Sequence, residues 1–252
     1  MIEILILSFI QGVTEFLPIS SSSHLIIISK YSNFTSQGLS IDVSLHIGSL
    51  IAVLSYFHKD LLDFVRNFKL FVKILIASIP VIIFGFFLVL TNLIEELRNI
   101  KIIGWTTLVF GIFLYLSDKF KLEKTIKSDF TFRSAIIIGL IQIFSLIPGV
   151  SRSGVTITAA RVLKFNRVDA AKISFLLSIP TLGAVSIFGM KNIFLSDNLS
   201  FSMLNLISIF FSFIFSLFTI KYFLEYINKF SLGLFVIYRI FLGIILLLIA
   251  YL

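Results

Sequence analysis

Long apolar runs, separated by short charged segments, dominate the sequence. Crossing a bilayer takes about 30 Å of hydrocarbon, or roughly 20 residues of helix, and six of the runs are long enough or nearly so. The pattern therefore predicts an all-α polytopic membrane protein. The expected crossings are residues 43–58, 74–92, 102–117, 171–190, 202–220 and 232–252.

Two further apolar regions are interrupted by polar residues and do not fit a simple crossing. Residues 2–29 contain the run SSSSH, and residues 134–160 contain SLIPGVSRSGVT. Irregular backbone at membrane depth is tolerated only where protein or a water-filled cavity covers it. We therefore expect each region to be a re-entrant helical hairpin, which enters the membrane and returns to the same side.

The charged segments predict the orientation of these hairpins. Segments 59–73, 118–133 and 161–172 are rich in Lys and Arg, and the positive-inside rule places such segments in the cytoplasm. Residues 134–160 must then leave the cytoplasmic side and return to it. By the same reasoning, residues 2–29 enter from the outer face.

Each half of the chain then has one hairpin and three crossings, in opposite orientations. When FLPISSS is aligned with LIPGVSR, Pro18 falls on Pro148. Three residues later, Ser21 falls on Ser151. Inverted repeats of this kind form binding sites where broken helices meet near the midplane. We predict a single integral membrane domain, 1–252, with repeats of approximately 1–117 and 118–252.

The composition agrees with this fold class and excludes several functions. Hydrophobic residues make up 58% and charged residues 13% of the chain, whereas a soluble domain carries about a quarter charged residues. The net charge is +8, and the Lys and Arg residues that carry it lie in short segments between the apolar runs. This distribution indicates cytoplasmic loops rather than a nucleic-acid-binding surface. There is no cysteine, which excludes disulfides and thiol chemistry. The sequence also lacks HExxH and P-loop motifs, and we expect no removable signal peptide.

A carboxylate within the first hairpin is the first candidate for chemistry. Glu15 lies in QGVTEFLP, and an ionisable residue at membrane depth is expensive and usually functional. The alternative is a Glu that is simply solvated near the interface. Gln11 is four residues earlier and shares a helical face with Glu15, so it can hydrogen-bond the carboxylate or ligate an ion.

The second hairpin carries PGVSRSGVT, residues 148–156. Gly149 breaks the helix and allows backbone N–H groups to approach an anion. Ser151, Arg152 and Ser153 follow at the expected start of a new helix, with Thr156 one turn further on. Helix N-terminal amides together with an arginine make a phosphate site. A purely structural pairing of Arg152 with Glu15 is the alternative.

The serine run becomes the opposing loop of the same site. The hydroxyls of Ser20 and Ser21 can hold anionic oxygens, or they can act as helix N-caps. His24 is a candidate general acid, base or nucleophile, although a lone histidine is more often structural.

For four other polar residues, the sequence does not predict a direct role in the chemistry. His46 and Asp42 are four residues apart, and either a structural role or support of the site is open for them. His58 lies in a charged loop and is interpreted as a surface residue. Arg239 lies within the last apolar run and is expected to pack inside the bundle.

The two motifs together resemble the bacterial undecaprenyl-diphosphate phosphatase family, the bacitracin-resistance proteins. The residues that carry the resemblance are QGVTE…SSSSH and PGVSRSGVT, and it extends over DVSLHIGSLIAVL, LLSIPTLGA and YRIFLG. Many members have Glu in place of Gln11, and many have Thr-Gly in place of Ser22-Ser23. The first difference weakens a two-carboxylate metal site.

The resemblance implies hydrolysis of undecaprenyl diphosphate to the monophosphate, with release of phosphate and help from a divalent cation, Mg²⁺ or Ca²⁺. Glu15 would be the essential carboxylate and a metal ligand. The attacking group would be Ser21, His24 or water. The remaining family positions would bind the diphosphate: Gln11, Ser20, Gly149, Ser151, Arg152, Ser153 and Thr156.

These features lead to one main hypothesis and one alternative. The main hypothesis is a lipid diphosphate phosphatase of the bacterial plasma membrane, with a site open to the outer face. It would recycle the lipid carrier for cell-envelope synthesis and confer bacitracin resistance. The alternative is a transporter of a phosphate-bearing lipid or small anion, because inverted repeats are common in transporters. The sequence is compatible with a monomer or a homodimer.

Overall fold

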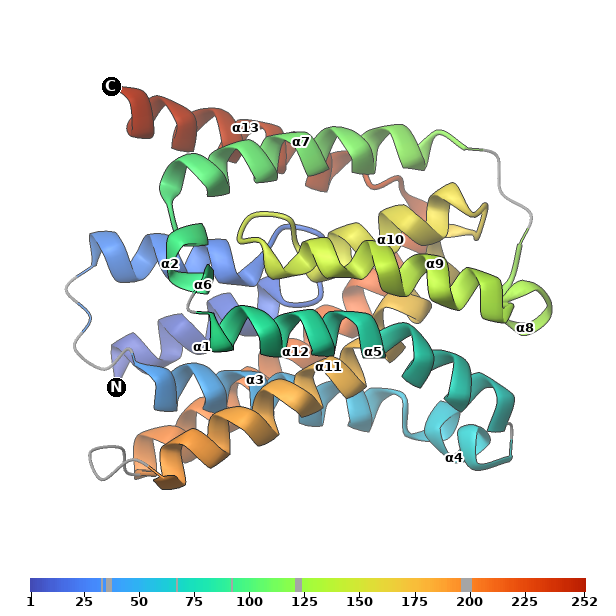
Figure 1. Cartoon of the computed structure of the whole chain (residues 1–252), viewed down its shortest axis with the longest axis horizontal. Coiled ribbons are helices and arrows are strands. Elements are labelled where there is room, and N and C mark those ends of the chain that lie inside the picture. Colours follow the sequence, from blue (N-terminus) through green and yellow to red (C-terminus); the bar gives the residue numbers. More distant parts are fainter. Residues whose placement is uncertain (33, 35–37, 67, 92, 121–123, 196–200) are drawn as a thin grey trace.

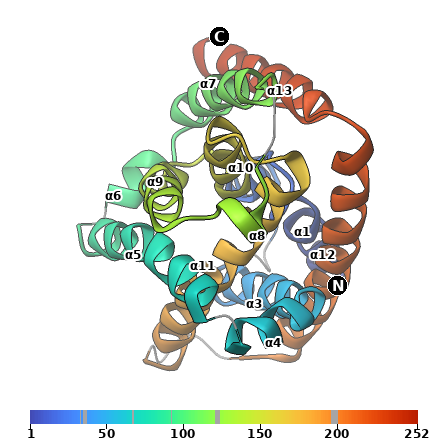
Figure 2. The ribbon, with the colours of Figure 1, turned by 90° about the vertical axis from the view of Figure 1, so that its right-hand side faces the viewer.

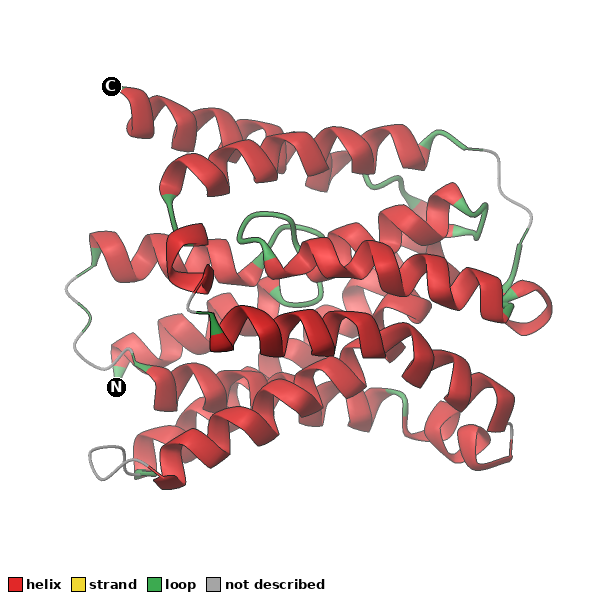
Figure 3. Cartoon of the chain, viewed as in Figure 1, coloured by secondary structure: helices red, strands yellow, loops and turns green. Residues whose placement is uncertain are grey.

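The computed structural model describes the chain except for residues 33, 35–37, 67, 92, 121–123 and 196–200. Part of the predicted loop 30–42 and Lys121 of the basic segment 118–133 therefore lie outside the described residues. The described chain is almost entirely helical (Figure 3). Its helices are α1 (Ile2–Thr14), α2 (Ser21–Tyr31), α3 (Leu39–Tyr56), α4 (His58–Arg66), α5 (Phe68–Leu90), α6 (Leu93–Leu97), α7 (Ile100–Asp118), α8 (Ile126–Asp129), α9 (Phe132–Gln142), the 3-10 helix η1 (Ile143–Leu146), α10 (Arg152–Val162), α11 (Arg167–Leu195), α12 (Met203–Lys229) and α13 (Gly233–Tyr251).

Six of these helices are long and apolar enough to cross a membrane: α3, α5, α7, α11, α12 and α13. They run along the long axis of the molecule in Figure 1, and α10 lies near the centre of the bundle in the end-on view of Figure 2. Large hydrophobic side chains remain exposed along them, as expected where lipid replaces water. The predicted all-α polytopic fold with six crossings is confirmed.

Several helices extend beyond the predicted crossings. Helix α3 begins at Leu39 rather than at residue 43, and α12 continues to Lys229 rather than ending at 220. An apolar run marks the part of a helix that lies in hydrocarbon, whereas the helix itself continues until its backbone hydrogen bonds end. The sequence pattern therefore predicted the crossings better than the helix ends.

The two broken regions form helical hairpins. Helices α1 and α2 join through a turn after Glu15, and α9 with η1 joins α10 through the turn before Arg152. The two turns meet in the middle of the bundle (Figure 3), where Ser153 Oγ of the second hairpin donates to the Leu17 carbonyl of the first at 2.7 Å. The re-entry of these hairpins into a bilayer stays a prediction.

Matched packing relates the two halves of the chain. Helix α1 of the first hairpin packs against α12, and α9 of the second hairpin packs against α5. Between the halves, α3 packs against α11 and α7 against α13. This is the arrangement that an inverted repeat requires, and the boundary at 117/118 stays a prediction.

The backbone corrects the alignment of the two turns. Ser20 and Ser151 both adopt left-handed backbone conformations, with φ of 74° and 70°, and each is the N-cap of the following helix. Each hydroxyl contacts the residues two and three positions further on. Ser20, rather than Ser21, is therefore the counterpart of Ser151. The aligned prolines suggested a register that differs from the structural one by one residue.

Candidate active site

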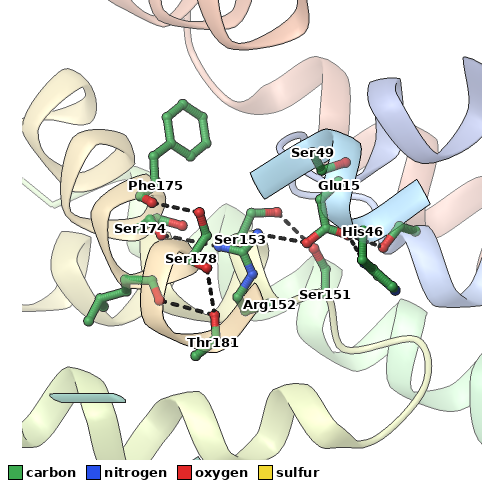
Figure 4. Close-up of polar contacts among 12 residues, drawn as sticks. Glu15, His46, Ser49, Ser151, Arg152, Ser153, Ser174, Phe175, Ser178 and Thr181 are labelled. Carbon is green, nitrogen blue, oxygen red and sulfur yellow. Dashed lines mark hydrogen bonds and ion pairs between the residues drawn. The ribbon is translucent and has the colours of Figure 1, made fainter. Parts of the chain in front are cut away.

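Glu15 and Arg152 form an ion pair between the two hairpin tips. Arg152 Nη2 donates to Glu15 Oε1 at 2.8 Å, and Arg152 Nη1 donates to the Ser174 carbonyl of α11 at 3.2 Å (Figure 4). Glu15 is buried and Arg152 largely so. The structure thus brings together the two charged residues that the sequence singled out. The positive charge of Arg152 stabilises the ionised form of the Glu15 carboxylate.

The second oxygen of the same carboxylate accepts two hydrogen bonds from the first hairpin. Ser21 Oγ donates to Glu15 Oε2 at 2.7 Å, and Gln11 Nε2 donates to the same oxygen at 3.0 Å. The Ser21 hydroxyl is therefore oriented by a carboxylate, which is the arrangement of a serine with an adjacent general base.

A cavity of about 590 Å³ opens in front of this group. One end is polar, and the walls are mostly apolar side chains of α5 and α11. The lining residues of α5 run from Val81 to Val89, and those of α11 from Thr181 to Lys191. Such a cavity fits a molecule with an anionic head and a long apolar part. The polar and charged residues that line it are Glu15, Ser20, Ser21, Ser22, His46, Gln142, Ser145, Ser151, Arg152, Thr181 and Lys191.

His46 lies at the site, a placement that the sequence left undecided. Its Nδ1 accepts a hydrogen bond from Gln11 Nε2 at 3.0 Å, and the side chain lines the cavity. The same nitrogen is 4.0 Å from Glu15 Oε2 (Figure 4). One feature of the sequence could have predicted this placement. His46 lies within a predicted crossing, and polar residues in a crossing usually face the interior of the bundle.

His24 lies elsewhere. Its Nδ1 contacts the Ser20 carbonyl at 2.7 Å, its Nε2 contacts the Tyr238 hydroxyl, and its ring stacks on that of Tyr238. A carbonyl only accepts hydrogen bonds, so Nδ1 carries a proton and Nε2 of the neutral ring accepts from Tyr238. His24 is not among the residues that line the cavity. His24 therefore lies between the Ser20 turn and Tyr238, and the structure does not bring it together with Glu15.

Four predicted diphosphate ligands have structural contacts instead of lining the cavity. Ser153 joins the two hairpin tips, as described above. Thr156 Oγ1 is 2.8 Å from the Arg152 carbonyl and 2.7 Å from Ser174 Oγ, so it steadies the residues around Arg152. Gly149 has a φ of 95°, and a Cβ there would lie 2.0 Å from Thr106 Oγ1 of α7. Gln11 also lies behind the cavity wall, where it contacts Glu15 and His46.

Arg239 of α13 donates hydrogen bonds to both hairpin tips. Its guanidinium is fully buried and donates to the Pro18 carbonyl of the first hairpin and to the Gly149 and Val150 carbonyls of the second, at 2.9–3.1 Å. Its Nε donates to the Thr107 carbonyl of α7 at 3.2 Å. The sequence predicted that Arg239 packs inside the bundle, but not these partners, because backbone carbonyls leave no side-chain signal.

A divalent cation at Glu15 would have to share its ligands with a bound phosphate. Among the described residues, no group of three or more His, Cys, Asp or Glu side chains could hold a metal alone. However, Gln11 Oε1 is buried beside Glu15 and has no hydrogen-bond partner in the described chain. Mg²⁺ typically binds through one or two protein oxygens together with substrate phosphates.

The fold and the site together define a class of protein. It is a polytopic membrane protein whose paired hairpins present a carboxylate, an arginine and serine hydroxyls at the polar end of an apolar-walled cavity. Comparison with known proteins then gives the family. Residues 4–245 match the family described as bacitracin resistance protein BacA, and the chain belongs to this family.

Proteins named undecaprenyl-diphosphatase are similar to the chain over nearly its whole length. The protein from Pelagibacter ubique (strain HTCC1062) is 54% identical over 251 residues, which cover 99% of this chain and 98% of that protein. The protein from Jannaschia sp. (strain CCS1) is 40% identical, with 98% and 97% covered. The protein from Saccharophagus degradans is 41% identical, with 94% and 93% covered.

Proposed function

We propose that this protein hydrolyses undecaprenyl diphosphate to undecaprenyl phosphate and inorganic phosphate. It thereby recycles the lipid carrier for peptidoglycan and other cell-envelope glycans and confers resistance to bacitracin. Family membership and the names of the relatives support this activity. The observation that carries it is the contact of Glu15 with both Ser21 and Arg152 at the polar end of an apolar-walled cavity.

Ser21 is the nucleophile in this proposal. Its Oγ attacks the terminal phosphorus, and its proton passes to Glu15 Oε2, which is 2.7 Å away. The bond from that phosphorus to the bridging oxygen breaks. The bridging oxygen leaves on the lipid phosphate with the electron pair and takes the proton from Glu15. His24 is a weaker candidate because it does not line the cavity.

A water molecule completes the cycle. Its oxygen attacks the phosphoserine while Glu15 accepts its proton. The bond from phosphorus to Ser21 Oγ breaks, and Oγ recovers a proton from Glu15. Arg152 stabilises the negative charge of the phosphoryl group in both steps, which is the main catalytic task in phosphoryl transfer.

The proposed cation is Mg²⁺ or Ca²⁺. Glu15 would hold it, together with oxygens of the diphosphate, while the Gln11 amide supports the carboxylate from behind the cavity wall. When bound, it neutralises part of the charge on the phosphates.

The site opens to the outer face of the bacterial plasma membrane in this proposal. The cavity residues of α5 and α11 all lie in the second halves of these helices, toward Leu90 and Leu195. Both helices begin next to basic segments, at Phe68 and Arg167, which the positive-inside rule assigns to the cytoplasm. The polyprenyl tail would lie along the apolar walls of the cavity.

The direct test is phosphate release from farnesyl diphosphate by the detergent-purified protein. We expect release by the wild type, loss in Ser21→Ala, and little change in the control Thr219→Val. The control is chosen because Thr219 does not line the cavity and its hydroxyl already bonds to a carbonyl within α12. Mass spectrometry after an acid quench should find phosphate on Ser21.

Other results would change the assignment. Full activity in Ser21→Ala would exclude Ser21 as nucleophile and make water the attacking group. No release by the folded wild type, with Mg²⁺ or Ca²⁺ present, would contradict the phosphatase and favour transport of a phosphate-bearing lipid, which a flipping assay in vesicles would then test.

A further inference from the structure

Gln142, the last residue of α9, is fully buried, and neither atom of its side-chain amide has a hydrogen-bond partner among the described residues. Buried polar groups are nearly always paired, and leaving one unpaired destabilises the folded protein. Gln142 is also part of the wall of the cavity that Glu15 and Arg152 line. An unpaired amide in the wall of a binding cavity is therefore a candidate ligand-binding group.

No other buried side chain combines these two properties in the described part of the chain. Buried unpaired side-chain atoms also occur on Gln11, Asp42, Arg161 and Ser186. None of these residues lines the cavity. The combination singles out Gln142.

The packing of α9 places Gln142 at the edge of the cavity, next to the contact between α9 and α5. One turn earlier, Gly139 is in backbone contact with α5, because a Cβ there would lie 2.3 Å from the Ala77 carbonyl oxygen. One turn after Ala77, Val81 lines the cavity. Gln142 thus lies where the tight contact between α5 and α9 ends and the cavity begins.

The hairpin repeat gives Gln142 a counterpart with a known partner. Gln142 precedes Ser151 by the same number of residues as Gln11 precedes Ser20. In the first hairpin, the Gln11 amide donates to the carboxylate of Glu15, one turn later. In the second hairpin, the residue one turn later is Leu146, which cannot accept a hydrogen bond, so the amide of Gln142 stays unpaired.

We propose that Gln142 binds the phosphate that stays on the lipid, by donating its amide N–H groups to the oxygens of that phosphate. This inference rests on the proposed function. Glu15, Ser21 and Arg152 surround the phosphoryl group that is transferred, and a diphosphate brings a second phosphate into the same cavity. Gln142 is then a specificity residue, which favours a lipid diphosphate over a lipid monophosphate as substrate.

The test compares two products that bind to different parts of the site. Farnesyl monophosphate carries the phosphate that stays on the lipid, and inorganic phosphate corresponds to the one that is transferred. In Gln142→Leu, we expect the Kd of farnesyl monophosphate to rise roughly tenfold, as for the loss of one or two hydrogen bonds to a charged group. The Kd of inorganic phosphate and both Kd values of the control Thr219→Val, a residue of α12 that does not line the cavity, should stay unchanged. Calorimetry on the detergent-purified protein measures all of these values.

A thermal-unfolding measurement separates this role from a structural one. Gln142→Leu removes a buried unpaired amide, so its apparent Tm should equal or exceed that of the wild type. A lower Tm would show a structural role, and an unchanged Kd for farnesyl monophosphate would overturn the inference. Binding is measured without turnover, so a wild type that binds these products but releases no phosphate from farnesyl diphosphate would contradict the proposed function alone.

Discussion

The Glu15 carboxylate and the Arg152 guanidinium meet at 2.8 Å, although 137 residues separate them in the sequence. Each residue belongs to a different hairpin, so the pair exists only when both hairpin tips are in place. The charges that would handle a phosphoryl group are thus assembled by the same contact that joins the two halves of the fold.

We expect Glu15→Gln and Arg152→Lys each to reduce the rate of phosphate release by at least about a hundredfold. Glu15→Gln keeps the size of the side chain but removes the base beside Ser21. Lysine at 152 keeps the charge, but its ammonium group cannot donate to both Glu15 and the Ser174 carbonyl as the guanidinium does. Steady-state kinetics on farnesyl diphosphate measures both effects. Near wild-type rates in either variant would show that the pair is structural.

Replacing Arg239 should uncouple the hairpins. In Arg239→Met, carbonyls of both tips and of α7 lose their donor, and we expect an apparent Tm about 10 °C lower in detergent. Activity should fall with it. Arg239→Lys should recover only part of the stability, because a single ammonium group cannot serve carbonyls on three segments. A Tm unchanged in Arg239→Met would contradict the role of Arg239 as a clamp.

His24 and Tyr238 should behave as one unit. The pair steadies the Ser20 turn, so His24→Gln and Tyr238→Phe should each lower kcat, by about tenfold, with little change in KM. The double variant should be no worse than either single variant, because the two residues share one contact. A loss of a thousandfold or more in His24→Gln alone, with Tyr238→Phe unaffected, would instead indicate direct acid–base catalysis by His24.

The residue at position 11 should set the affinity for the divalent cation. Gln11→Glu adds a second carboxylate beside Glu15, so less Mg²⁺ or Ca²⁺ should restore half of the activity after treatment with EDTA, by about a factor of ten. Gln11→Leu removes the hydrogen bond that orients Glu15 Oε2, so this variant should require more cation. The measurement is a titration of activity against free cation. Identical curves for the three proteins would place the cation away from position 11.

The sequence was sufficient for the fold class and for the two charged residues at the centre of the site. Crossings follow from how much apolar length a bilayer demands and from where positive charge accumulates. Glu15 was identified because an ionisable residue at membrane depth is usually functional, and Arg152 because an arginine beside a helix N-terminus makes a phosphate site. Their direct pairing was only the structural alternative. Neither inference depends on packing detail, so both could be made from the residues alone.

The environment of the other site residues could not be predicted from the sequence. His24 lies beside the serine run in the chain, yet its ring turns toward Tyr238 of α13. His46 lines the cavity from α3, whose packing in backbone contact with α12 at Gly48 has no signal in the hydrophobic pattern. These outcomes depend on how helices that are distant in sequence fit together, and hydrophobic periodicity does not encode that fit.

The Arg239 clamp also has a mechanical consequence. A carrier that works by rocking one repeat against the other must separate surfaces near its midplane during every cycle. Here, such a motion would pull Pro18 away from Gly149 and Val150. The buried guanidinium of Arg239 donates hydrogen bonds to the carbonyls of all three residues. The centre of the molecule is therefore built as a fixed joint, which a rocking motion would have to break in every cycle.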